Sequence, residues 1–203
     1  MRIVLASGSP RRRKILEEMG VRFDVISNDV DESIESDLLC NPAAVAQKIA
    51  ERKAAAAVEV LADENFRGEM LIISADTIVV HNGQVYGKPA DTEEAYKMLK
   101  SLSNSVHDVI TGVSLWLASA SNDEDFNLGF RSFSETTQVF FKDLSDEDIY
   151  GYLALGEHVD KAGSYAIQGA ASKFVSRISG CRDNVIGLPS TRLKQEFSEI
   201  LQI

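Results

Sequence analysis

The sequence predicts a mixed α/β fold, with helices flanking a sheet that contains hairpins. Apolar runs with the length of buried strands alternate with helix-like segments that begin at recognisable caps. Two pairs of strand-like runs are separated by turn or polar segments, as in hairpins. Other strands stand alone between helices, and the combination of hairpins with isolated strands predicts a sheet that is not purely parallel.

The elements expected in the first half follow from apolar periodicity and turn residues. Pro10 suits the first turn of a helix that Gly20 ends, and Asn41 suits the cap of a long alanine-rich helix. Asn82-Gly83 is a strong hairpin turn. In order, we expect a strand at 2–6, a helix at 10–19, an alternating segment at 21–27, an acidic loop at 28–39, a helix from 42 to about 61, a polar turn at 64–69, strand at 70–74 and 77–81 with a break around 75–76, and a strand at 84–86.

In the second half, helix caps and one long loop stand out. Asp91 with Glu94, and Ser145 with Asp148, have the spacing of capping boxes. In order, we expect a helix at 91–102, strands at 106–117 and 130–141 joined by a polar segment at 120–127, a helix at 145–155, a loop at 156–169, a strand at 173–178 and a helix at 189–201. Long loops of this kind are usually functional.

Composition bounds the classes of function. The chain has 203 residues, of which 44% are hydrophobic, so it can bury one sizeable core in a single domain or two small lobes. Its net charge of −10 is the opposite of that expected for a general nucleic-acid binder. We therefore expect a small anionic partner and no nucleic acid.

Cysteine usage and hydropathy indicate the cellular compartment. Cys40 and Cys181 lie far apart without metal-ligand spacing, which fits a reducing cytosol and predicts neither a zinc site nor a disulfide framework. No apolar run approaches transmembrane length, and the start does not have the charge order of a secretory signal. We expect a cytoplasmic protein with no membrane partner.

The N-terminal segment from Ser7 to Lys14, SGSPRRRK, is the strongest functional signal. It follows an apolar strand, and Pro10 at a first helical turn leaves backbone N–H groups free at the positive end of the helix. Four consecutive cations lie on the same turn. These features suit a polyphosphate anchor, although no Walker pattern is present. The alternative is a solvated basic turn that only caps a helix.

Asp76 is the second signal, because it is a single carboxylate within an apolar strand, where burial without a partner is costly. It could be a metal ligand or a general base that takes a proton from water. The alternative is a bulge residue whose carboxylate accepts backbone N–H groups. Glu32 is a plausible second carboxylate for Mg²⁺, although an acidic loop residue is usually just solvated.

Three cations and one amide complete the candidate site. Lys88 lies between Gly87 and Pro89, which fix the backbone around it. Lys53 lies on the long helix, where the default interpretation of a lysine is a surface ion pair with a neighbouring residue. Lys161 and Gln168 lie in the long loop, and the Gln168 amide offers both a donor and an acceptor to a base edge. The alternative for Gln168 is a bond to nearby backbone.

Taken in order, several short segments resemble the Maf family of nucleoside triphosphate pyrophosphatases over nearly the whole chain. The segments are LASGSPRR from Leu5, AERKA from Ala50, ADTIV from Ala75, GKP from Gly87, TGV from Thr111, DKAGSYAIQG from Asp160 and NVIGLP from Asn184. Any one of these segments is weak evidence, but the ordered set is highly specific.

The resemblance implies an enzyme that cleaves a nucleotide between its α- and β-phosphates, releasing a monophosphate and pyrophosphate. It implies a divalent cation (Mg²⁺, Mn²⁺ or Co²⁺), a homodimer, and an inosine triphosphatase-like fold in which residues 1–203 form one domain with two lobes around a cleft. Asp76 matches the proton acceptor. The phosphate and metal pocket is matched by Ser7, Arg12, Glu32, Lys53 and Lys88, with Asp76 and Glu32 as metal ligands, and we expect Ser9 and Lys161 to bind substrate as well.

Base selection in the branch acting on dTTP and UTP is tied, by the same resemblance, to the positions of Arg11, Thr77 and Gln168. Another branch, acting on 7-methyl-GTP, typically carries Thr and Trp where this chain has Gly8 and Pro10. The chain therefore looks like the pyrimidine branch, with CTP or modified pyrimidine nucleotides as further candidates.

Two other classes of function remain open from the residues. A non-catalytic nucleotide sensor that regulates cell division could use the same anion pocket without making product. A phosphomonoesterase or kinase is disfavoured, because Asp76 lacks the DxDxT pattern and the chain lacks a GxxxxGK[ST] loop.

Overall fold

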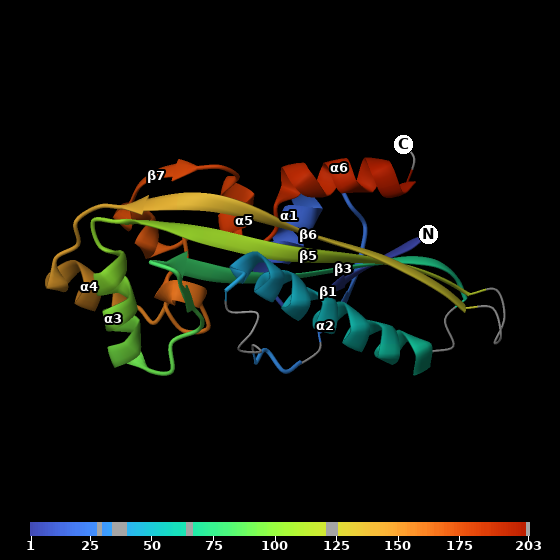
Figure 1. The fold of residues 1–203 in the computed structure, drawn as a ribbon, viewed down its shortest axis with the longest axis horizontal. Helices are drawn as coiled ribbons and strands as arrows, with labels where there is room; N and C mark the ends of the chain where they lie inside the picture. The colour runs from blue at the N-terminus through green and yellow to red at the C-terminus, as the bar shows by residue number, and fades with distance from the viewer. Residues whose placement is uncertain (28–29, 34–39, 64–66, 121–125, 202–203) are drawn as a thin grey trace.

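A seven-stranded mixed sheet runs through the centre of the protein (Figure 1). The structure is a computed structural model and describes residues 1–27, 30–33, 40–63, 67–120 and 126–201. The strand order is β2-β1-β3-β5-β6-β7, with β4 paired to β3 alone. Strand β1 is parallel to β2 and β3, and the other pairs are antiparallel. The strands are β1 (Arg2–Ala6), β2 (Asp24–Ile26), β3 (Gly68–His81), β4 (Gln84–Tyr86), β5 (Val106–Ala120), β6 (Phe126–Phe141) and β7 (Val175–Ser179).

Helices cover both faces of this sheet, which confirms the predicted mixed α/β class. The α-helices are α1 (Pro10–Glu18), α2 (Pro42–Asp63), α3 (Thr92–Leu102), α4 (Asp146–Leu153), α5 (Arg182–Ile186) and α6 (Ser190–Leu201). Helix α2 lies on one face, α1, α5 and α6 lie on the other, and α3 and α4 cover one end (Figure 1). None of the helices in the described ranges is both long and apolar enough to cross a bilayer. The division into two lobes stays a prediction.

Several local signals produce the expected elements. The Asn41 carboxamide accepts a hydrogen bond from the Ala44 N–H at the start of α2. Ser145 and Asp148 form a reciprocal capping box on α4. The turn between β3 and β4 places Asn82 and Gly83 at positive φ, as a tight hairpin requires. These features explain why helix starts and the first hairpin are predictable from sequence.

The expected break in the strand around Asp76 is wrong. Strand β3 runs without interruption from Gly68 to His81, and its register with β5 passes through Asp76, which pairs with Gly112. Asp76 is accommodated because a cation from α2 neutralises it, as described below. The second hairpin is also longer than expected, and α5 was not foreseen. Residues 28–29 and 34–39 of the acidic loop, 64–66 of the polar turn and 121–125 of the polar segment lie outside the described residues.

One edge of β3 carries a gap between two neighbouring strands. Pairing of β1 with β3 ends at Leu5 and Ile73, and pairing of β4 with β3 begins at Tyr86 and Val79. Residues 74–78 therefore pair with β5 on one side only. The loop after β1 and the loop after β4 both leave the sheet at this gap, so side chains from distant parts of the chain can meet there.

Helix α2 packs directly on β5 at Gly112. A Cβ atom at this position would overlap the backbone of Ala46, because helix and strand approach more closely than a side chain allows. Gly112 pairs with Asp76 across the sheet, and Lys53 lies two helical turns beyond Ala46. The missing side chain at Gly112 thus lets α2 bring Lys53 to Asp76.

We expect Gly112→Ala to lower the free energy of unfolding by about 1–3 kcal/mol or more, because overpacking forces the helix and strand apart. Gly129→Ala is the matched control, since a Cβ atom at Gly129 on β6 would meet no atom within 4 Å. Urea unfolding of the two variants measures the difference. Equal stabilities would contradict the close-approach account.

Candidate active site

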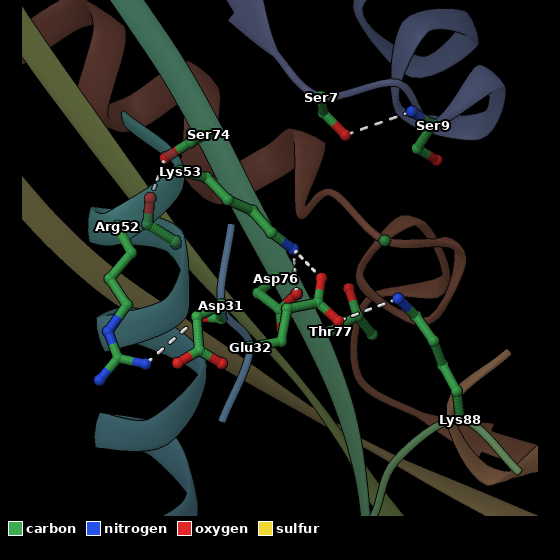
Figure 2. Close-up of polar contacts among 12 residues, drawn as sticks. Ser7, Ser9, Asp31, Glu32, Arg52, Lys53, Ser74, Asp76, Thr77 and Lys88 are labelled. Carbon is green, nitrogen blue, oxygen red and sulfur yellow. Dashed lines mark hydrogen bonds and ion pairs between the residues drawn. The ribbon is translucent and has the colours of Figure 1, made fainter. Parts of the chain in front are cut away.

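Two carboxylates and two lysines form a connected group at the gap (Figure 2). The Lys53 ammonium lies 2.6 Å from Asp76 Oδ1 and 2.8 Å from Glu32 Oε1. The Lys88 ammonium lies 2.9 Å from Glu32 Oε2. The Lys53 and Asp76 side chains are only 14% and 12% exposed, so this ion pair is shielded from solvent. The sequence default for Lys53, a surface ion pair on the helix, is therefore wrong.

The lysines determine the charge state of Glu32. Partial burial would raise the pKa of this carboxyl, but hydrogen bonds and charges from Lys53 and Lys88 outweigh it and lower the pKa to about 2. The same contact raises the pKa of Lys88, chiefly through its hydrogen bond to Glu32. Both groups are therefore charged at neutral pH, and the cluster is a fixed arrangement of alternating charges.

Arg12 approaches the same gap from the opposite face of the sheet. Its Nε donates to the Gly187 carbonyl at 2.9 Å, Nη1 to Ser7 Oγ at 3.0 Å and Nη2 to Thr77 Oγ1 at 3.2 Å. Burial lowers the pKa of Arg12, while the charges of Asp76 and Glu32 act to raise it. Arg12 is thus held by three residues, Ser7, Thr77 and Gly187, and lies within electrostatic reach of both carboxylates.

The turn that precedes α1 uses its hydroxyl groups internally. Ser9 caps the helix by accepting from the Arg12 N–H at 3.5 Å, and the Ser9 N–H donates to Ser7 Oγ at 3.3 Å. Two backbone N–H groups of this turn are therefore not free, contrary to the expectation from sequence. In this conformation the Arg12 side chain is the main cation that the turn directs to the gap.

Arg11 and Lys161 add positive charge beside this group, whereas Gln168 stands apart. Burial lowers the pKa of Arg11, and its Nε is buried with no hydrogen-bond partner among the described residues. Burial also lowers the pKa of Lys161, and the charges of Arg11 and Lys88 contribute. Gln168 is exposed and makes no hydrogen bond to a described residue. Lys161 thus acts on the cluster through its charge, while its ammonium donates to the Val159 carbonyl at 3.0 Å, and Gln168 lies exposed in the same loop.

The carboxylates have the chemistry of a magnesium site that substrate would complete. Among the described residues, no group of three or more His, Cys, Asp or Glu side chains could hold a metal ion. Mg²⁺, however, is often bound by one or two carboxylates together with substrate phosphates. Glu32 and Asp76 share one cation, the Lys53 ammonium, which shows that their oxygens converge on a common cationic partner. The donor set fits the group.

Sequence reasoning assigned no role to three residues that support this site. Thr111 and Asn184 are fully buried and connect to Thr77, and Gly187 contacts Arg12. All three lie in segments that carry the family resemblance, but neutral residues give no charge signal. The clue available in the sequence was the Thr111-Gly112 pair within an otherwise largely apolar strand.

The protein is thus a mixed α/β protein in which acidic and cationic side chains gather at a gap in the central sheet. The chain belongs to the Maf family, because the family model described as Maf-like protein matches residues 2–200.

Curated relatives cover nearly the whole chain. The dTTP/UTP pyrophosphatase of Pelotomaculum thermopropionicum is 44% identical over 94% of this chain and 92% of its own. Those of Carboxydothermus hydrogenoformans and Bdellovibrio bacteriovorus are 42% and 40% identical, over 98% and 97% of both chains respectively. Among solved structures, the Staphylococcus aureus Ham1 protein covers 98% of both chains at 14% identity with a TM-score of 0.40, a distant likeness.

The Glu32 carboxyl should titrate near pH 2 rather than near its ordinary pKa of 4.5, as measured by NMR of its side-chain carbon. Because the folded-state pKa is lowered, this interaction stabilises the fold above pH 4.5, and the contribution is lost as the pH falls towards 2. Lys88→Gln should raise the pKa of Glu32 by roughly one unit, since one of two cationic partners is removed. Lys97→Gln, which removes an exposed lysine paired with Glu93, is the control and should leave the pKa of Glu32 unchanged. A Glu32 midpoint near 4.5 in the unmodified protein would contradict this geometry.

Proposed function

We propose that this protein hydrolyses dTTP and UTP to the nucleoside monophosphate and pyrophosphate. Support comes from family membership and from relatives of 40–44% identity that are named dTTP/UTP pyrophosphatases. The observation that carries the proposal is the cluster of Lys53, Asp76, Glu32 and Lys88 facing Arg12 at one gap. This is an arrangement of charges suited to a polyphosphate chain beside a carboxylate base.

In the proposed reaction, Asp76 orients a water molecule and takes its proton as the water oxygen attacks the α-phosphorus. The bond from the α-phosphorus to the bridging oxygen breaks, and pyrophosphate leaves with the electron pair. Arg12, Lys53 and Lys88 stabilise the negative charge that develops on the phosphates. Asp76 contacts a largely buried lysine and lies in the part of β3 whose edge no strand covers, which supports this role.

No single contact can supply the rate enhancement. A hydrogen bond to a charged group contributes about 1.5–3 kcal/mol, whereas a millionfold acceleration requires about 8 kcal/mol. Several cations and the base must therefore act together. Because Arg12, Lys53 and Lys88 are already held by protein contacts, little reorganisation is needed when substrate binds.

The proposal includes a divalent cation, Mg²⁺ or else Mn²⁺ or Co²⁺, held by Asp76 and Glu32 together with the substrate. The cation would neutralise phosphate charge and polarise the phosphoryl oxygens. Removal with EDTA should abolish turnover, and Mg²⁺ should restore it. We further propose a cytoplasmic homodimer, and light scattering at low micromolar concentration measures its mass.

The function is tested by incubating the protein with dTTP, UTP, CTP and GTP and identifying the products by ³¹P NMR. We expect pyrophosphate and monophosphate from dTTP and UTP. Asp76→Asn should lower kcat by about 10²–10⁴-fold or more, because the proton acceptor is lost. Thermal unfolding of the variant, with and without dTTP, controls for folding and binding.

Other products would identify the rival classes of function. Tight nucleotide binding without product would indicate a sensor, and orthophosphate release would indicate a phosphatase. Full pyrophosphate release by Asp76→Asn would overturn the role of Asp76 and leave the reaction itself intact.

A further inference from the structure

A chain of hydroxyl groups connects Arg12 to the short helix α5. The Thr77 and Thr111 hydroxyl oxygens lie 3.0 Å apart, and Thr111 Oγ1 donates to the Asn184 backbone carbonyl at 3.0 Å. Thr77 Oγ1 accepts from Arg12 Nη2. Arg12 Nε donates directly to the Gly187 carbonyl one helical turn further on. Helix α5 therefore holds the guanidinium both directly and through two hydroxyl groups.

The carbonyl at the end fixes the direction of this chain. A carbonyl oxygen can only accept, so the single Thr111 hydroxyl proton is committed to Asn184. Thr111 can then only accept from Thr77, and the single Thr77 proton is committed in turn. Thr77 has no proton left to give, so it faces the gap solely as an acceptor, and Arg12 Nη2 occupies one of its two lone pairs.

Ser7 differs from Thr77 in this respect. Its oxygen accepts from Arg12 Nη1 and from the Ser9 N–H, so its own hydroxyl proton remains available. Arg12 uses three of its five N–H groups on Ser7, Thr77 and Gly187, and one remains on each terminal nitrogen. Donors for an anion thus remain on Ser7 and Arg12 but not on Thr77.

The α5 end of the chain is firmly anchored. Asn184 is fully buried, and its side-chain amide donates to the Val109 carbonyl and to Thr137 Oγ1, at 3.0 Å each. The carbonyl that sets the direction therefore cannot rotate away without breaking bonds to β5 and β6. Thr111 is also fully buried, which excludes water as a competing partner.

We infer that Thr77, Thr111 and the turn from Asn184 to Gly187 are positioning residues that aim the Arg12 guanidinium at the substrate phosphates. Thr77 acts on the phosphate end of the substrate through Arg12 and does not donate to the base. This inference rests on the proposed function, and it differs from the base-selecting role that the family resemblance implies for Thr77.

The experiment compares nucleotides with inorganic tripolyphosphate, which has phosphates and no base. Thr77→Val should weaken tripolyphosphate binding about tenfold, as expected when a hydrogen bond to a charged group is lost. It should raise KM for dTTP, UTP and CTP by a similar factor and leave the ratios of their kcat/KM values unchanged. Thr77→Ser restores the hydroxyl and should lie within about twofold of wild type, against that tenfold loss.

Thr111→Val tests the hydrogen-bond relay from Asn184 through Thr111 and Thr77 to Arg12 at a position away from the gap. Like Thr77→Val, it should weaken tripolyphosphate binding. Ser114→Ala is the matched control, because it removes another fully buried hydroxyl group from β5. The Ser114 hydroxyl contacts Ser132 and is not one of the hydroxyl groups that connect Arg12 to α5. Thermal unfolding verifies that each variant folds. If Thr111→Val does not fold, the comparison of Thr77→Val with Thr77→Ser decides the inference.

A changed preference among the bases with unchanged tripolyphosphate binding in Thr77→Val would overturn the inference, and so would wild-type binding by folded Thr111→Val. Tripolyphosphate binding is measured by calorimetry and needs no turnover. Absence of pyrophosphate release by wild type would therefore contradict the proposed function while the relay is still tested.

Discussion

The ammonium of Lys53, held between the carboxylates of Asp76 and Glu32, is the interaction on which the site depends. A charged Asp in the middle of a sheet is tolerated only when a partner compensates for its lost hydration. Lys53 supplies that compensation at 2.6 Å and also connects Asp76 to Glu32. Removing either partner leaves a buried charge, which is far more costly than the net value of the pair.

The gap in the sheet explains how one small region gathers side chains from so many segments. Alternate residues of β3 face opposite sides, so Asp76 points towards α2 while Thr77 points towards α5. Where no strand covers the edge, the two sides are continuous. Arg12 on one side and Lys53 on the other can therefore act on the same substrate.

Local structure was predictable because short-range chemistry determines it. Asn41 and Ser145 cap helices as expected, and Asn82-Gly83 forms the hairpin turn. The break around Asp76 was predicted wrongly because the sequence does not reveal its partner, which lies 23 positions away on another element. A residue-by-residue prediction assigns Asp a strand-breaking tendency, whereas the fold neutralises the charge.

The candidate residues were recognisable by charge, and the residues that support them were not. Arg12 and Lys88 stood out as cations on an acidic chain, whereas Glu32 was a weak signal in an acidic loop, and the structure brings the three together. Thr111 and Asn184 are neutral, and their importance arises from burial and from hydrogen-bond direction. Helix α5 has only five residues, which is too short for a periodic pattern to reveal.

The most direct test of the central claim is a double-mutant cycle on Lys53 and Asp76, read as free energies of urea unfolding. If Lys53 offsets the buried charge of Asp76, Lys53→Met should lower the free energy of unfolding by about 3–5 kcal/mol. Adding Asp76→Asn to that variant should then recover at least about 1 kcal/mol relative to its effect in the wild-type background. If Asp76→Asn has the same effect in both backgrounds, the ion pair does not hold Asp76 in the sheet, and the account is contradicted.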